Sequence, residues 1–166
     1  MKWVLLAIGM GLGVTGTSHD ARSLSFYHTH TGKALSVVYY ENGRYVPGAL
    51  DEINDFLKDF RNGDEHRMDP ALFDVLFDIK LKTGTRAPFQ VISAYRSPAT
   101  NQMLRDNTAG VAKDSMHLRG QAIDVRLADV PLAKLRSVAL DLQKGGVGFY
   151  PESQFVHVDT GRIRWW

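Results

Sequence analysis

The sequence predicts a single α+β domain in which an antiparallel sheet packs against helices. Runs rich in aromatic and β-branched residues predict strands, and stretches with apolar residues three and four positions apart predict helices. The two kinds of element do not alternate regularly, which argues against a doubly wound parallel sheet. No repeat, low-complexity tract or linker divides the 166 residues, so we expect one domain over residues 23–166.

The composition is that of a globular protein without a strongly charged surface. Hydrophobic residues make up 44% of the chain and the formal net charge is only +2, so we expect no nucleic acid partner. Cysteine is absent, which excludes a disulfide partner and thiolate ligands. Any metal must therefore be held by histidine, aspartate or glutamate.

The first residues have the pattern of an export signal. Lys2 precedes an apolar stretch over residues 3–14, and Val14-Thr15-Gly16 is a plausible cleavage site. We expect a signal peptide over residues 1–16, with an end between 16 and 22. The apolar stretch is shorter than the roughly 20 residues that a membrane span needs, and a retained N-terminal anchor is the alternative.

The first part of the domain is predicted to contain a hairpin followed by a helix. Residues 23–46 alternate as strands around turns at Thr31-Gly32-Lys33 and Asn42-Gly43. Residues 47–63 have helical spacing and are expected to stop at Gly63. The apolar stripe of this helix is Leu50, Ile53, Phe56, Leu57 and Phe60.

Caps and turn residues delimit the later elements. Asp69 is expected to cap a helix that begins at Pro70 and ends at Thr83-Gly84. Ser97 is expected to cap a short helix that runs to about Arg105. The remaining predictions are a helix over residues 130–143 and strands over residues 88–95, 121–127, 147–150 and 155–159.

His117, Asp124 and His157 offer the ligands of a catalytic zinc site, two imidazoles and a carboxylate with one position left for water. Gly120 allows the chain to turn between the first two. Side chains alternate across a strand. If the valine and isoleucine side chains of both strands face the helices, Asp124 and His157 point to the same open side. We therefore predict a metal centre built from two distant segments.

The other histidines are weaker candidates for metal ligands. His28 and His30 are two residues apart on a predicted strand, which suits a metal pair, but no third ligand is near them in sequence. We expect both on an exposed hairpin. His66, in a polar loop, and His19 are expected to be exposed to solvent.

The metal motif resembles that of a known superfamily. The spacing Ser115-x-His117-x-x-Gly120-x-Ala122-x-Asp124, with a later His157, is similar to the zinc site of the D-Ala-D-Ala carboxypeptidase and VanX-like metallopeptidases. These enzymes are grouped with lysostaphin-type peptidases and the hedgehog N-terminal domain. The resemblance implies the same α+β fold and one zinc ion per chain.

A closer resemblance is to the murein endopeptidase branch of that superfamily. It is carried by residues 72–97, Thr100-Asn101, 110–125 and 145–166, which together span most of the chain after the signal. The resemblance implies a periplasmic enzyme that opens peptide cross-links between the stem peptides of peptidoglycan.

The resemblance also implies roles for individual residues. It makes His117, Asp124 and His157 the zinc ligands. Arg96 matches an arginine that stabilises charge on the reacting carbonyl, which suits a guanidinium because it is always charged and donates paired hydrogen bonds. Ser115 matches a position close to the substrate, where it would hydrogen-bond a peptide group, and Gln121 is a second such candidate.

One position departs from the pattern of many relatives. They have a Glu or Asp general base three residues before the last histidine, where this chain has Gln154. Asp159 is the best replacement, because it shares a strand face with His157. Its rival role is to hold an imidazole in the correct tautomer. Glu152 is a further candidate from the preceding loop.

Three functions remain open on the sequence alone. The first is endopeptidase action on cross-links, and the second is D,D- or L,D-carboxypeptidase action that trims stem peptides. The third is a domain that binds zinc and peptidoglycan without hydrolysis, because Gln154 replaces the usual acid. The sequence gives no oligomeric state.

Overall fold

The computed structural model describes residues 20–108 and 110–166. The predicted signal peptide over residues 1–16 and His19 lie outside these residues. In the described part no helix is long and apolar enough to cross a membrane. The helices are α1 (Pro47–Phe56), α2 (Pro70–Thr83), α3 (Pro98–Asn107), η1, a 3₁₀ helix (Met116–Arg119), and α4 (Leu132–Leu142). The strands are β1 (Arg22–His28), β2 (Ala34–Glu41), β3 (Arg44–Tyr45), β4 (Phe89–Ser93), β5 (Ala122–Arg126), β6 (Gly146–Tyr150), β7 (Phe155–Asp159) and β8 (Arg164–Trp165).

All eight strands form one sheet, in the order β3-β2-β1-β4-β5-β7-β6-β8. This confirms the α+β class, but the sheet is mixed rather than purely antiparallel. β4 is parallel to β1 and β8 is parallel to β6, while the other neighbours are antiparallel. The β1–β4 pair is parallel because the chain passes through β2, β3, α1 and α2 before it returns to the edge of β1. β8 is an additional strand that the sequence analysis did not predict.

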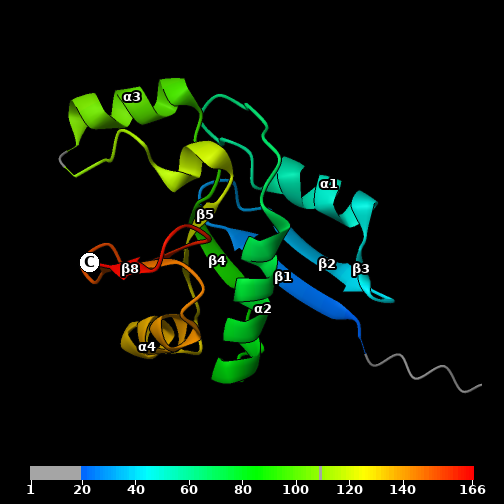
Figure 1. The fold of residues 1–166 in the computed structure, drawn as a ribbon. Helices are drawn as coiled ribbons and strands as arrows, with labels where there is room; N and C mark the ends of the chain where they lie inside the picture. Colours follow the sequence, from blue (N-terminus) through cyan, green and yellow to red (C-terminus); the bar gives the residue numbers. More distant parts are fainter. Residues whose placement is uncertain (1–19, 109) are drawn as a thin grey trace, which may run out of the picture.

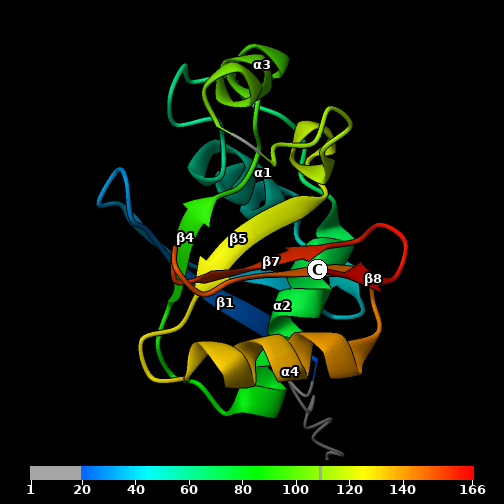
Figure 2. The same cartoon turned by 90° about the vertical axis from the view of Figure 1, so that its left-hand side faces the viewer.

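Three helices cover the sheet and enclose the core. α1 contacts β2, α2 contacts β1 and α4, and α4 contacts β6 and β7. Figure 1 shows α3 at the opposite end of the molecule from α4, and Figure 2 shows α4 below the strands β7 and β8. Burial of a large apolar side chain contributes about 1.5–3 kcal/mol. The fully buried apolar side chains include Leu24, Phe26, Ile53, Leu57, Leu72, Phe73, Leu76, Ile79, Phe89, Val91, Ile123, Val125, Leu135 and Val156.

The helix predicted over residues 47–63 ends earlier, at Phe56. The cause is Asp59, which is fully buried and starts a turn closed by a hydrogen bond from the Gly63 amide to the Asp59 carbonyl. The Asp59 carboxylate accepts hydrogen bonds from the Arg61 and Ser97 amides, at 3.1 and 2.9 Å. The bond to Ser97 reaches a segment distant in sequence, and together these bonds outweigh the helical pattern of the apolar residues.

The predicted helix caps are confirmed. The Asp69 carboxylate accepts from the Ala71 amide at the start of α2, and Gly84 ends that helix with a left-handed φ of 69°. The Ser97 hydroxyl accepts from the Thr100 amide and caps α3.

The expectation that His28 lies on an exposed hairpin is wrong. Its side chain is buried, with 1% of its surface exposed, and its ring packs against Phe56 and Phe60. His30 stacks on Phe60 with the ring centroids 4.3 Å apart. His66 is exposed, as predicted.

Candidate metal centre

His117, Asp124 and His157 meet on the face of the sheet that the helices leave open. Asp124 on β5 and His157 on β7 are direct partners in the antiparallel ladder, so their side chains leave the same face. His117 comes from η1, which precedes β5. Its Nε2 lies 3.2 Å from His157 Nδ1 and 3.3 Å from Asp124 Oδ1, and His157 Nδ1 lies 2.9 Å from Asp124 Oδ1. The predicted convergence of the three side chains is present.

Local sequence holds His117 in place. The Ser115 hydroxyl accepts from the His117 amide and caps η1, and Gly120 closes it with a left-handed φ of 65°. A Cβ on Gly120 would lie 2.5 Å from the Arg67 carbonyl oxygen, so the backbones approach too closely for any other residue. The His117 Nδ1–H donates to the Ala94 carbonyl at 2.6 Å, which leaves Nε2 as an acceptor toward the other two side chains.

His157 is fixed from behind by Asp159. Its Nε2 donates to Asp159 Oδ2 at 2.9 Å, which turns Nδ1 toward His117 and Asp124. Asp159 is fully buried, and its carboxylate also accepts from the amides of Gly146 and Gly161, at 3.0 and 2.8 Å. Arg164 donates to both carboxylate oxygens, at 3.0 and 2.6 Å.

The three facing atoms fit a tetrahedral metal ion. Two imidazole nitrogens and a carboxylate oxygen are all electron-pair donors, and each imidazole is held in that orientation by a hydrogen bond from its other nitrogen. A zinc ion bound at about 2.0–2.1 Å would separate its ligands by about 3.3 Å. The separations of 2.9–3.3 Å between the three atoms are close to that value. The buried group formed by these residues could therefore hold a divalent cation.

The charges of the site are set by burial and by these hydrogen bonds. Burial acts to raise the pKa of Asp124, but the charge and hydrogen bonds of His117 and His157 lower it well below its ordinary value. Burial acts to lower the pKa of His157, but hydrogen bonds to Asp124 and Asp159 raise it to about 9. In the metal-free protein the carboxylates thus favour a positive charge on His157, at the position where a cation would bind.

The three side chains line a cleft of about 620 Å³. One wall is the loop over residues 110–115, and another contains aromatic side chains from β6, β7 and the segment after β8. The cleft is lined by Arg96, Thr108, Gly110, Val111, Ala112, Asp114, Ser115, Met116, His117, Asp124, Tyr150, Ser153, Phe155, His157, Arg164 and Trp166.

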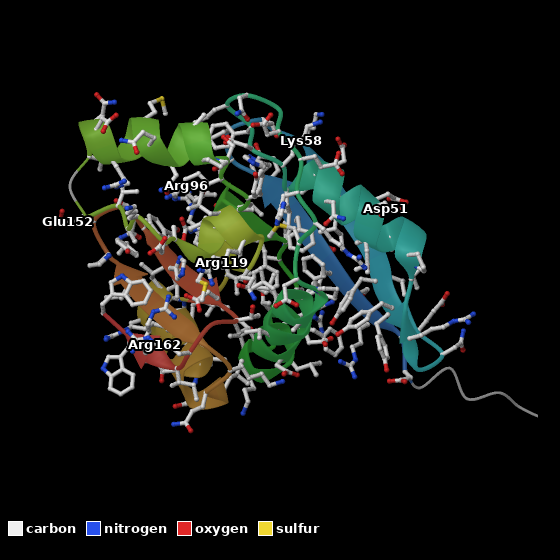
Figure 3. All side chains as sticks on the ribbon, turned by 45° about the horizontal axis from the view of Figure 1, so that its top comes forward. Asp51, Lys58, Arg96, Arg119, Glu152 and Arg162 are labelled. Atoms are coloured by element: carbon white, nitrogen blue, oxygen red, sulfur yellow. The ribbon has the colours of Figure 1, made fainter. Side chains whose placement is uncertain are left out.

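Arg96 reaches the cleft from the segment between β4 and α3, and Figure 3 shows it under α3. Its amide donates to the His117 carbonyl at 3.2 Å, which couples its backbone to the segment that carries His117. Burial lowers the pKa of the guanidinium, and the Asp124 carboxylate partly offsets this. Arginine keeps its charge despite such shifts, so Arg96 brings a positive charge to the cleft.

The aromatic wall is formed around Trp166. Its indole lies against Gly148, where a Cβ would come within 2.7 Å of the ring, and its centroid is 5.3 Å from that of His157. The Trp166 Nε1–H donates to the Tyr150 hydroxyl at 2.7 Å, and Tyr150 stacks on Phe155. The wall thus shields one side of the His157 imidazole.

The cleft includes some of the predicted site residues and leaves others out. Ser115 lines it, as a substrate-contacting residue would. Gln121 does not, because it precedes β5 and alternation directs it away from the face that carries Asp124. Glu152 is exposed in the turn between β6 and β7, also outside the lining, and Figure 3 shows it at the outer edge of the molecule.

The geometry does not suit Asp159 as a general base. The prediction rested on the strand face that it shares with His157. Asp159 is instead behind the imidazole and outside the cleft, and its oxygens already accept from His157, Arg164 and two backbone amides. The rival role, orientation of His157, fits these contacts.

Sequence reasoning missed Tyr150, Trp166 and Asn101. The two aromatic residues lie in a stretch that carries the resemblance to murein endopeptidases, but nothing in its spacing indicates that they meet. Asn101 is one of the two buried residues of α3, and Thr100-Asn101 carries part of the resemblance, but nothing in the sequence indicated its contacts with Arg96 and Ala112.

Comparisons with known proteins agree with the geometry. A family model described as "Peptidoglycan L,D-endopeptidase MepK" matches residues 16–166. Peptidoglycan L,D-endopeptidase MepK of Escherichia coli strain K12 is 41% identical, over 87% of this chain and 80% of its own length. A probable peptidoglycan L,D-endopeptidase MepK of Haemophilus influenzae is 41% identical, over 99% of this chain and 94% of its own length.

The fold, the cleft and these relatives define a peptidoglycan peptidase of a metallopeptidase class. The chain belongs to the MepK family of peptidoglycan L,D-endopeptidases. The resemblance to murein endopeptidases that the sequence motifs carry is thereby confirmed.

Proposed function

We propose that this protein is a zinc-dependent endopeptidase that hydrolyses peptide cross-links in peptidoglycan. The observation that carries the proposal is the convergence of three electron-pair donors, from His117, Asp124 and His157, in an open cleft. The relatives named as L,D-endopeptidases support the choice of bond, which is a cross-link between stem peptides.

Several residues of the cleft, together with Asp159 behind His157, have a part in this mechanism. A zinc ion held by His117, Asp124 and His157 would polarise the scissile carbonyl and lower the pKa of a water molecule toward ~7. Arg96 donates hydrogen bonds to the oxygen on which negative charge develops. Ser115 hydrogen-bonds a peptide group of the substrate. Asp159 keeps the His157 imidazole in the tautomer that a metal ligand needs.

Asp114 is our candidate for the group that accepts the proton of the attacking water. The carboxylates that line the cleft in the described part of the chain are Asp124 and Asp114, and the first is a metal ligand. A general base has to reach the water directly or through one other water molecule. Asp114→Asn should therefore lower kcat by about 10²-fold or more while leaving the zinc content unchanged. Unchanged kcat would exclude Asp114 from this role.

The experiment that tests the function is a digest of purified disaccharide-peptide dimers and monomers, with the products read by mass spectrometry. We expect the wild-type protein to split dimers and to leave monomers intact, and His117→Ala and Asp124→Ala to be inactive but folded. Trimming of monomers would indicate a carboxypeptidase instead. Bound zinc with no turnover of either substrate would indicate a non-catalytic binding domain.

We also propose that the enzyme is exported and acts on peptidoglycan in the periplasm. The pattern of residues 1–16 and the class of substrate support this. Cell fractionation and N-terminal sequencing of the mature protein test it. A new N-terminus between residues 17 and 23 is expected, and an intact N-terminus in the membrane fraction would favour a retained anchor.

A further inference from the structure

Asn101 is a buried polar residue that joins two parts of the cleft. It lies on α3 with 3% of its surface exposed. Its Oδ1 accepts a hydrogen bond from Arg96 Nη1 at 3.3 Å, and its Nδ2 donates to the Ala112 carbonyl at 3.2 Å. Arg96 and Ala112 both line the cleft, whereas Asn101 does not. It therefore contacts the cleft only through other residues.

The Arg96 guanidinium depends on this contact. Over residues 20–108 and 110–166, Asn101 supplies the only side-chain hydrogen bond to Arg96, and no carboxylate forms a salt bridge with it. Its Nε is buried and has no hydrogen-bond partner. A long side chain with one polar contact and a fixed charge needs that contact to keep its orientation, because it otherwise regains rotamer freedom.

The side-chain amide of Asn101 holds the loop over residues 110–115. This loop forms one wall of the cleft, and the Asn101 amide is bonded to it at Ala112. The backbone of Asn101 is itself anchored. Its backbone amide donates to the Ser97 carbonyl, and the Ser97 amide in turn donates to the buried Asp59 carboxylate. Asn101 thus links a fixed helix start to both Arg96 and the loop.

We propose that Asn101 is a positioning residue that aligns Arg96 with the reacting carbonyl and couples it to the loop wall. The proposal rests on the function proposed above, in which Arg96 stabilises the developing oxyanion. A displacement of about 1 Å in such a group is enough to cost about 10²-fold in rate. Loss of the Asn101 amide should therefore act on the chemical step through Arg96, and on substrate binding through the loop.

The first test compares Asn101→Ala with a matched control on the same helix. Asn107 is an exposed asparagine on α3 that donates to the Met103 carbonyl at 2.7 Å and does not line the cleft. On cross-linked dimers, Asn101→Ala should lower kcat by about tenfold or more and raise KM by less. Asn107→Ala should leave both unchanged. Both variants should bind as much zinc as the wild-type protein.

A double-mutant cycle separates positioning from a general structural effect. Arg96→Lys removes the guanidinium group that contacts Asn101. If Asn101 acts through Arg96, adding Asn101→Ala to Arg96→Lys should lower kcat no further. A purely structural role predicts that the two losses multiply. Multiplying losses, or an unchanged kcat in Asn101→Ala alone, would overturn the proposal.

Asn101→Asp is the variant that tests the proposal if Asn101→Ala does not fold. It keeps an acceptor for Arg96 but has no donor for the Ala112 carbonyl, so it should keep most of kcat and raise KM. A loss of kcat with KM unchanged would contradict the assignment. If Arg96→Lys is itself as active as the wild-type protein, the role proposed for Arg96 fails. If Arg96→Lys is impaired but Asn101→Ala is not, only the positioning role fails.

Discussion

Asp159 shows how one buried carboxylate organises the candidate metal centre. It accepts from His157, Arg164 and two glycine amides, and the sum of these contacts lowers its pKa despite full burial. The charge it places behind His157 makes Nδ1 a better electron-pair donor. The Arg164 guanidinium balances that charge, so the buried Asp159 carboxylate is paired although water does not reach it.

We therefore expect Asp159→Asn to weaken zinc binding by about 10–100-fold. The amide can still accept one hydrogen bond, but it carries no charge to offset Arg164 or to polarise His157. Titration against a chromogenic chelator measures the affinity. Arg162→Ala, on an exposed neighbour of Arg164, is the control and should bind zinc normally. Wild-type affinity in Asp159→Asn would show that the carboxylate does not support the ligand.

His28 should make folding sensitive to acid for a reason unrelated to the metal. Burial, together with the charges of His30 and Arg61, lowers its pKa to about 4. In the unfolded chain the His28 imidazole binds a proton near pH 6.5, whereas in the folded protein it does so only near pH 4. The contribution of neutral His28 to the free energy of unfolding is therefore complete above pH 6.5 and is lost as the pH falls toward 4.

The free energy of unfolding should therefore drop by about 1–3 kcal/mol between pH 6.5 and pH 4 through His28 alone. Urea denaturation at a series of pH values measures it. His28→Phe keeps an aromatic ring against Phe56 and Phe60 and should flatten the profile in this range. An equally steep profile in His28→Phe would assign the acid sensitivity to other groups.

At the scale of elements, strand alternation is the part of the site that sequence predicts well. The face shared by Asp124 and His157 follows from the apolar residues on either side of each, and the observed register pairs the two directly. Helix ends were less predictable. α1 stops at Phe56 because Asp59 is bonded to the Ser97 amide, a contact between segments that no local pattern encodes.

The position of Trp166 depends on the strand β6, because only a glycine at position 148 leaves room for the indole. Gly148→Ala should displace the ring, raise KM for cross-linked dimers severalfold and alter the tryptophan fluorescence. Gly48→Ala on α1, where a Cβ meets no atom within 4 Å, is the matched control. Unchanged KM with a shifted emission spectrum would show that the aromatic wall does not contact the substrate.

At the scale of the molecule, the centre is a product of the strand order. β5 and β7 are neighbours because β6, which precedes β7 in the chain, lies on the far side of β7 from β5. β8 then pairs with β6 and brings Arg164 to Asp159. Local patterns predicted these strands except β8, but not their order or the parallel pairs, because pairing depends on the packing of the whole chain. The contact of Arg164 with Asp159 and the aromatic wall could not be predicted for the same reason.

The most direct test is a zinc titration of the chelator-treated protein during cleavage of cross-linked dimers. We expect no cleavage without metal, a linear rise on addition of zinc, and a plateau at one zinc ion per chain, with no rise for His157→Ala. Full cleavage by the folded, metal-free protein, or a plateau that is the same in His157→Ala, would contradict a catalytic zinc held by His117, Asp124 and His157.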